Sequence, residues 1–155
     1  MLKFKKINLE KHREKVLKFR KDSFIVSFGD AFGFGEDDDY LRWLQENIVA
    51  YPEGFILVEE DGELIGQLEL SIREYEDRNI GYINLYYLIP KKRENGIGQV
   101  LHKYAKQFFK SNNVSEYHLR VSPTNSSAMC FYRILGMKEI GPEIDGKVIR
   151  MKGYL

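Results

Sequence analysis

The chain has 155 residues and a formal net charge of +1, with 24 basic and 23 acidic residues. This balance argues against a nucleic-acid-binding surface, and no apolar run approaches the roughly 20 residues of a membrane span, so we expect neither nucleic acid nor membrane as a partner. The single cysteine, Cys130, excludes an intrachain disulfide and is expected to be a small core residue. The length predicts one domain over residues 1–155, and the absence of a signal-peptide pattern fits the cytoplasm.

The N-terminal third predicts one strand and two helices. Residues 2–8 alternate as in a strand, and Asn8 can cap a helix that runs from Leu9 to about Lys21. Residues 24–35 contain three glycines and four phenylalanines, which predicts a loop that either folds over the core or lines a binding funnel. The acidic run at 36–39 precedes the second helix and suits its N-terminal dipole; alternatively, it attracts a cationic amine to the funnel.

Three strands are predicted next, over residues 55–60, 64–72 and 83–89. An Asp-Gly turn joins the first two into a hairpin. In the second strand, Glu69 shares one face with Gln67 and Ser71. The polar segment 73–79 predicts a turn into the third strand, which is apolar and aromatic and is closed by a proline.

The segment after the third strand has the pattern of an anion-binding loop. It reads Arg93-Glu94-Asn95-Gly96-Ile97-Gly98, and an amphipathic helix follows to Lys110. The first N–H groups of a helix lack intrahelical acceptors and lie at the positive end of its dipole, and glycines let a ligand approach them closely. The loop therefore predicts a phosphate or pyrophosphate site. It lacks the Gly-Lys-Ser/Thr of a P-loop, and Leu101 stands where a dinucleotide fingerprint has its third glycine.

After this helix the sequence predicts a strand over residues 116–121, a short helix over residues 126–135 and a terminal hairpin of residues 137–144 and 147–154. His102 and His118 are expected to be structural, and no residue cluster has metal-ligand spacing, so no metal is predicted. The order β-α-α-β-β-β-α-β-α-β-β mixes hairpins with helical crossovers, which predicts a mixed sheet.

Two segments resemble motifs of the GNAT acyltransferase superfamily. The Gly96 loop resembles the Arg/Gln-x-x-Gly-x-Gly/Ala signature that grips the pyrophosphate of coenzyme A, with Glu94 where the family often has glycine. The second segment resembles Asn-x-x-Ala-x-x-Phe-Tyr…Gly-Phe, matched here by Asn125, Ala128, Phe131, Tyr132, Gly136 and Met137, with Met137 in place of Phe. With the element order, the resemblance covers about the whole chain. It implies the GNAT fold, an α/β architecture with a mixed, mostly antiparallel sheet of about seven strands and helices on both faces.

The resemblance implies an acetyl-CoA-dependent N-acyltransferase that acts on a primary amine of a small molecule or peptide by direct attack in a ternary complex. The residues that it assigns to coenzyme binding are Leu88, Arg93, Glu94, Asn95, Gly96, Ile97, Gly98, Gln99, Asn125 and Tyr132. For two of them another interpretation stays open: Arg93 could be an ordinary surface arginine, and Asn125 could cap its helix as well as, or instead of, binding pantetheine amides.

The resemblance also implies a bulge in the strand 85–89, which parts it from the strand at His118 and leaves the Leu88 N–H to stabilise the thioester oxygen. Tyr132 would return a proton to the thiolate, unless it is only a buried aromatic residue. Glu69 is the candidate base, because Asn84, where a base is first sought, cannot accept a proton. The acceptor is expected against residues 24–35, the second helix and the terminal hairpin, whose edge could also support a homodimer. A CoA-binding sensor without turnover and a general anion-binding domain are the rival hypotheses.

Overall fold

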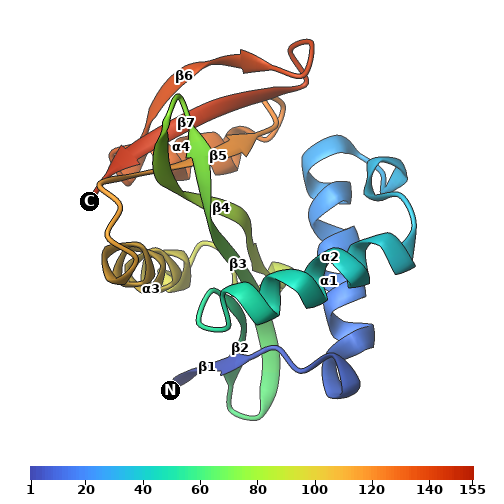
Figure 1. Cartoon of the computed structure of the whole chain (residues 1–155). Helices are drawn as coiled ribbons and strands as arrows, with labels where there is room; N and C mark the ends of the chain where they lie inside the picture. The colour runs from blue at the N-terminus through green and yellow to red at the C-terminus, as the bar shows by residue number, and fades with distance from the viewer.

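A computed structural model describes all 155 residues and contains one seven-stranded sheet with helices on both faces (Figure 1). The strands are β1 Leu2–Lys6, β2 Phe55–Glu60, β3 Glu63–Tyr75, β4 Arg78–Leu88, β5 Glu116–Val121, β6 Lys138–Glu143 and β7 Val148–Tyr154. The helices are α1 Leu9–Phe28, α2 Asp37–Ala50, α3 Ile97–Ser111 and α4 Ser126–Ile134, with 3₁₀ turns at Phe32–Phe34 and Pro90–Lys92. This order of helices and strands is the predicted one.

The sheet order is β1-β2-β3-β4-β5-β7-β6, and only β4 and β5 run parallel to each other. The predicted mixed, mostly antiparallel sheet is confirmed. The helices α1 and α2 cover one face, where Phe19 and Leu44 pack on sheet residues such as Leu57. The helix α3 covers the other face, where Phe109 and its neighbours form the larger of the two cores with help from α4. Figure 1 shows the two helix layers on opposite sides of the twisted sheet.

Two segments differ from the sequence prediction in their extent. The first helix does not end near Lys21 but continues to Phe28, and a left-handed Gly29 caps it at φ +87°. Residues 24–35 are therefore only partly a loop, because Phe24 lies in the last turns of the helix and packs against Phe28 and Phe34, with ring centroids 5.9 and 6.0 Å apart. Aromatic packing thus overrides the glycine-rich composition that predicted irregular structure.

The segment 73–79, predicted as a turn, is mostly strand in the structure. The strands β3 and β4 extend through it to the pair Tyr75–Arg78, and the turn consists of Glu76 and Asp77 alone, both at positive φ. Tyr75 supports this extension, because its ring packs edge-on against His118 at a centroid distance of 4.7 Å. Cys130 is a further correction, since it lies exposed on α4 rather than in the core.

One residue of β4 interrupts its pairing with β3. Ile83 faces Leu70 and Leu85 faces Glu69, so Asn84 is an extra residue in β4 and forms a bulge. The bulge lies one residue before the segment 85–89 in which it was predicted. On its other side, β4 pairs with β5 only from Gly81 to Ile83 and then diverges. The remaining halves of both strands are therefore free to line a cleft.

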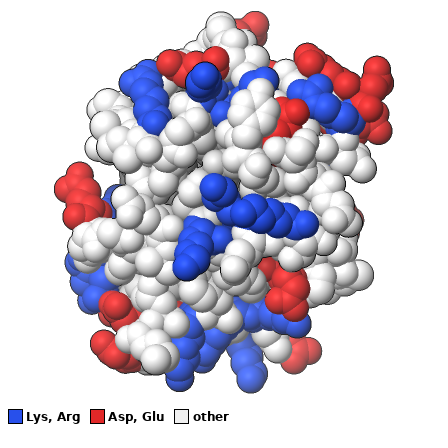
Figure 2. Space-filling view, turned by 90° about the vertical axis from the view of Figure 1, so that its left-hand side faces the viewer, with Lys and Arg blue, Asp and Glu red and all other residues white.

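No helix is long and apolar enough to cross a lipid bilayer. Figure 2 shows the side of the molecule that carries α3, with basic side chains near its centre and acidic side chains toward its edges. The helix α3 carries three lysines, Lys103, Lys106 and Lys110.

Candidate active site

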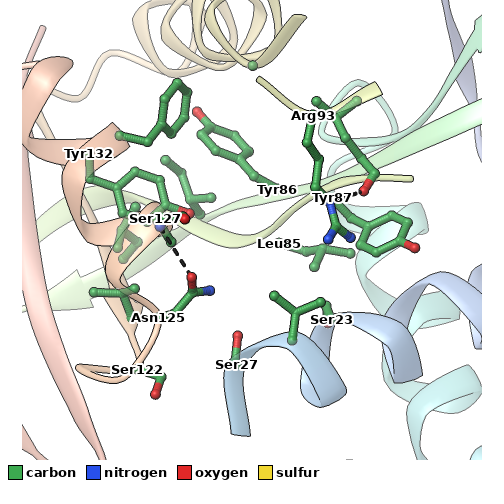
Figure 3. Close-up of a pocket in the computed structure, with 18 of the residues that line it drawn as sticks. Ser23, Ser27, Leu85, Tyr86, Tyr87, Arg93, Ser122, Asn125, Ser127 and Tyr132 are labelled. Atoms are coloured by element: carbon green, nitrogen blue, oxygen red, sulfur yellow. Dashed lines mark hydrogen bonds between the residues drawn. The ribbon is translucent and has the colours of Figure 1, made fainter. Parts of the chain in front are cut away.

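A cleft of about 810 Å³ opens where β4 and β5 diverge. Its walls are the last turns of α1, the start of α3, the second halves of both strands and the helix α4 (Figure 3). In Figure 3, Ser23 and Ser27 of α1 lie across the cleft from Asn125 and Tyr132. The parting of the strands, which the bulge accompanies, therefore creates the cavity.

The hydrogen-bond alternation of β4 leaves donors that face this cleft. The N–H of Ile89 donates to the Ile65 carbonyl of β3, with an N···O distance of 2.8 Å. Since successive N–H groups of a strand point to opposite sides, those of Leu88 and Tyr86 point away from β3, toward the parted β5. The Leu88 carbonyl faces the same way and accepts a hydrogen bond from Arg93 Nε at 2.7 Å. Leu88, predicted as a donor, thus shares its orientation with Tyr86, whose N–H was not predicted as a donor.

The loop before α3 presents a row of unpaired backbone donors. The N–H groups from Glu94 to Gln99 have no acceptor within the protein, and α3 begins without a side-chain cap. Gly96 lies at φ +88°, which a glycine adopts without strain, and a Cβ at this position would meet nothing. Gly98 has a different role, because a Cβ there would lie 2.9 Å from the ring of Phe131 on α4. One glycine shapes the loop and the other lets α4 approach it.

The side chains of the loop divide into two groups. Arg93, Glu94 and Gln99 line the cleft, whereas Asn95 and Ile97 do not. Arg93 is half-buried and turns back onto Leu88, with its guanidinium 5.5 Å from the Tyr87 ring. It is therefore not an ordinary surface arginine, and its fixed charge stands beside the free N–H groups.

Helix α4 supplies the second predicted motif. The Asn125 side chain accepts a hydrogen bond from the Ala128 N–H at 3.2 Å, so it caps α4, and it also lines the cleft. Tyr132 points into the cleft and toward Tyr86, with ring centroids 6.4 Å apart (Figure 3). Burial raises the pKa of Tyr132 to about 12. Its hydroxyl has no hydrogen-bond partner in the protein, so a protonated phenol is available to a ligand.

Tyr86 differs from Tyr132 because its hydroxyl is already paired. It lies 3.1 Å from His102 Nδ1, and His102 Nε2 lies 3.0 Å from the hydroxyl of Tyr117. Burial, followed by the nearby charge of Lys106, lowers the pKa of His102 to about 4, so the imidazole is neutral near pH 7. Neither His102 nor His118 lines the cleft, in agreement with their predicted structural role.

Comparison with known proteins assigns the chain to a family. The sequence profile of the acetyltransferase (GNAT) family matches residues 15–137. The chain belongs to the GNAT family. Among relatives, it is 30% identical over 97 residues to the aminoglycoside N(6')-acetyltransferase type 1 of Klebsiella aerogenes, a match that covers 59% of this chain and 64% of the relative.

Two further matches describe the extent of the likeness. The mycothiol acetyltransferase of Acidothermus cellulolyticus is 26% identical over 119 residues, which cover 69% of this chain and 36% of that protein. The chain thus spans less than two thirds of the length of the curated relatives that it matches. The PaiA N-acetyltransferase of Thermoplasma acidophilum, solved in complex with coenzyme A, superimposes with a TM-score of 0.77 at 21% identity, over 100% of this chain and 99% of that one. The GNAT fold is therefore confirmed over the whole chain.

The residues at this loop fit the pyrophosphate of coenzyme A, which the Thermoplasma acidophilum structure contains. A pyrophosphate requires several convergent donors and positive charge, and the loop offers six free N–H groups beside Arg93. Glu94 is the one acidic residue of the lining and stands at this loop. Its backbone is left-handed, at φ +63°, a conformation that glycine adopts without strain.

Glu69, the predicted base, lies beneath the cleft rather than on its lining. Its side chain is fully buried, and one oxygen accepts a hydrogen bond from Arg20 at 2.5 Å. The other oxygen accepts hydrogen bonds from the Tyr40 hydroxyl and from Gln67 Nε2, the latter at 2.7 Å. Arg20 also reaches the Asn84 carbonyl at 3.3 Å, so Glu69 holds this arginine against the bulge.

The α1 wall of the cleft was not predicted in detail. Arg20, Ser23, Phe24, Val26, Ser27 and Phe28 line it, in the last turns of the helix. Thr124, which precedes α4, donates a hydrogen bond to the Ser27 carbonyl at 3.3 Å and so bridges the two sides of the cleft. The only sequence signal for this wall was the aromatic content of residues 24–35, which favoured a binding funnel as one of two interpretations.

Proposed function

We propose that this protein is an N-acyltransferase that transfers an acetyl group from acetyl-CoA to a primary amine of a small molecule or peptide, by direct attack in a ternary complex. The observation that carries the proposal is the continuity of one cleft from the free N–H groups before α3 to the unpaired phenol of Tyr132. Membership of the GNAT family and the likeness to a coenzyme A complex support it.

In this proposal the loop from Arg93 to Gln99 holds the pyrophosphate through its backbone N–H groups, and Arg93 adds positive charge. The pantetheine arm lies along β4, beside Asn125. The N–H of Leu88 donates to the thioester oxygen as negative charge develops on it, and the N–H of Tyr86, roughly 7 Å away along the strand, is left for another oxygen of the arm. They are fixed by the β3 ladder on their far side, so they need little reorganisation during the reaction.

Tyr132 is proposed to assist the departing sulfur. Its phenol is protonated throughout the neutral pH range and unpaired, so it can donate a hydrogen bond or a proton to the thiolate. For the amine, the sequence prediction made Glu69 the base. With both oxygens occupied and no access to the cleft, Glu69 would need a relay through water. We propose instead that Glu69 positions Arg20 and that the acceptor enters as the free amine.

The absence of a carboxylate or imidazole at the acceptor end of the cleft favours one rival, a CoA-binding module without turnover. Two measurements separate these functions. Acetyl-CoA should raise the melting temperature more than ATP or NAD at equal concentration, because a ligand that binds only the folded state stabilises it by mass action. Release of free CoA in the presence of amines then identifies turnover; binding of acetyl-CoA without release under any amine would support the sensor.

A further inference from the structure

Arginine side chains dominate the charge around the bulge, at the end of the cleft away from the coenzyme loop. Arg20 of α1 and Arg120 of β5 both line the cleft. No lysine or aspartate lines it, and its single glutamate, Glu94, belongs to the coenzyme loop. The remaining wall at this end is the apolar end of α1, with Phe24 and Phe28.

Two more arginines stand directly behind the first pair. Arg73 of β3 donates to the Asn84 side-chain oxygen at 2.6 Å, and its guanidinium lies 3.7 Å from the Tyr82 ring centroid. It has no carboxylate within ion-pair distance, and its other nitrogens have no partner. Arg150 of β7 is buried, lies 4.4 Å from the Tyr75 ring centroid and shares Tyr82 with Arg73 at 5.8 Å.

The carboxylates of this region do not balance these charges. Glu69 pairs with Arg20, and Glu143 is shared between Arg120 and Arg150, each of which uses only its Nε toward it, at 2.8 and 2.9 Å. Four guanidinium groups thus face two carboxylates. Arg73 is exposed, and its pKa is lowered first by partial loss of solvent and then, against the opposing effect of Tyr82, by the charges of Arg120, Arg150 and Arg20. Such crowding of like charge is relieved when an anion binds.

The acidic residues that could have attracted a cationic acceptor are engaged elsewhere. Asp37 pairs with Lys21 at 2.8 Å, and Asp38 and Asp39 pair with arginines at 3.7 and 3.3 Å. None of the three lines the cleft. The alternative interpretation of the run 36–39, in which its carboxylates attract a cationic amine, therefore finds no support at the cleft.

From these contacts, and resting on the proposed acyl transfer, we infer that the acceptor is an amine that also carries a carboxylate, and that Arg73 and Arg120 bind this carboxylate. Both arginines keep nitrogens without protein partners and reach the cleft or the bulge that borders it. The free guanidinium edges suit the planar, paired oxygens of a carboxylate. A polycationic acceptor would instead meet an uncompensated positive field.

The strand geometry limits the distance between amine and carboxylate. Asn84, which holds Arg73, precedes Tyr86 by two residues and Leu88 by four. At about 3.3 Å per residue, the arginine contact lies roughly 7 to 13 Å along β4 from the N–H groups of these two residues, which face the thioester arm. That distance exceeds the span of a single α-amino acid and equals about two to four residues of extended chain. This distance favours a peptide amine whose carboxylate is its own C-terminus or an acidic side chain.

The test compares peptides that differ only in charge, in a CoA-release assay with acetyl-CoA. The set contains Ala-Ala-Ala, its C-terminal amide, Ala-Glu-Ala amide, Ala-Lys-Ala amide and free alanine, with spermidine and kanamycin as cationic amines. The carboxylate peptides should exceed their neutral or basic counterparts in kcat/KM by about 10- to 100-fold, the range of a charge-assisted hydrogen bond. Ala-Ala-Ala tests a C-terminal carboxylate and Ala-Glu-Ala amide tests a side-chain carboxylate, so the two peptides show which of them is recognised.

The variant R73Q/R120Q should remove this preference by raising KM for the carboxylate peptides while kcat stays near its original value, since uniform binding is lost. The matched control is R133Q, because Arg133 is exposed on α4, pairs with Glu139 and lies outside the cleft. Preference for spermidine or kanamycin, or a charge preference that survives in R73Q/R120Q, would overturn the inference.

Binding of the same peptides to the CoA-loaded protein, measured by calorimetry, separates this inference from the proposed function. Carboxylate-dependent binding that R73Q/R120Q abolishes supports the inference even if no CoA is released. In that case only the proposed acyl transfer is refuted, and the carboxylate site stands. Equal binding of the free acid and its amide overturns the inference, whatever the turnover.

Discussion

Replacement of Tyr132 by phenylalanine tests the proposed proton donor, and the structure sets the size of the effect. The pKa of Tyr132 is raised to about 12 by burial, whereas an alkyl thiol has a pKa of about 8.5. Complete transfer of the phenol proton to the thiolate is therefore uphill by about 3.5 pKa units, or roughly 5 kcal/mol. Tyr132 is expected to act mainly as a hydrogen-bond donor to the sulfur, with solvent as the final source of the proton.

This limited driving force places the effect at the lower end of the range for general acid catalysis. We expect Tyr132→Phe to lower kcat about 100-fold, which corresponds to about 2.7 kcal/mol of transition-state stabilisation. Acetyl-CoA affinity should change less than about threefold, because the hydroxyl has no partner in the protein and its removal leaves no buried group unpaired. CoA release gives kcat, and calorimetry gives the dissociation constant.

The control is Tyr154→Phe, since Tyr154 is exposed on the terminal strand and lies outside the cleft. This variant should keep full activity. If Tyr132→Phe retained kcat within about twofold, the phenol would have no part in departure of the thiol. If it lost affinity for acetyl-CoA and kcat together, its role would be in coenzyme binding.

Four further outcomes follow from the geometry of the site. Gly96→Val should abolish acetyl-CoA binding with little loss of fold, because a β-branched residue is strained at φ +88° in a loop that lies in open space; unchanged affinity would refute the anion-binding loop. Gly98→Ala should lower the melting temperature by several degrees, since its Cβ would lie 2.9 Å from Phe131, and the pair Gly98→Ala with Phe131→Leu should regain part of that loss. Glu69→Gln should destabilise the fold by about 3 kcal/mol in urea denaturation by leaving Arg20 without its carboxylate, whereas a large fall in kcat at unchanged stability would restore Glu69 as the base. His102 has a pKa of about 4 in the folded protein and about 6.5 in the unfolded chain, so the unfolded chain binds the proton first as the pH falls. The free energy of unfolding should therefore fall by up to about 3 kcal/mol between pH 6.5 and 4. The variant His102→Gln should reduce this loss.

The sequence predicted those parts of the structure that depend on neighbouring residues. The strands 55–60 and 116–121 match the structure residue for residue, because alternation and turn residues are local signals. The loop around Gly96 was found for the same reason, since its free N–H groups follow from the start of one helix. Asn125 satisfies its local interpretation as a helix cap and still lines the cleft.

The sequence could not predict contacts that depend on tertiary packing. Arg20 and Glu69 are 49 residues apart, and nothing in either segment indicates that they meet. The end of α1 was obscured by glycines, although the packing of Phe24 against Phe28 and Phe34 keeps the helix regular to Phe28. Cys130 lies in a short helix whose sequence is mostly apolar, so composition alone placed it in the core, whereas the structure exposes it.

The bulge at Asn84 determines which face of the sheet each later side chain of β4 occupies. Side chains two residues apart in a regular strand lie on the same face. Ile83 instead packs in the α3 core and Leu85 in the α1–α2 core, so the extra residue reverses the alternation. If β4 instead kept all its residues in regular alternation, Tyr86 would point toward α1 and α2 and would lose both His102 and its place opposite Tyr132. The bulge that marks the parting of β4 from β5 therefore also brings the second tyrosine to the cleft. The Asn84 carbonyl and side chain hold Arg20 and Arg73, the second of which is proposed to bind the carboxylate of the acceptor.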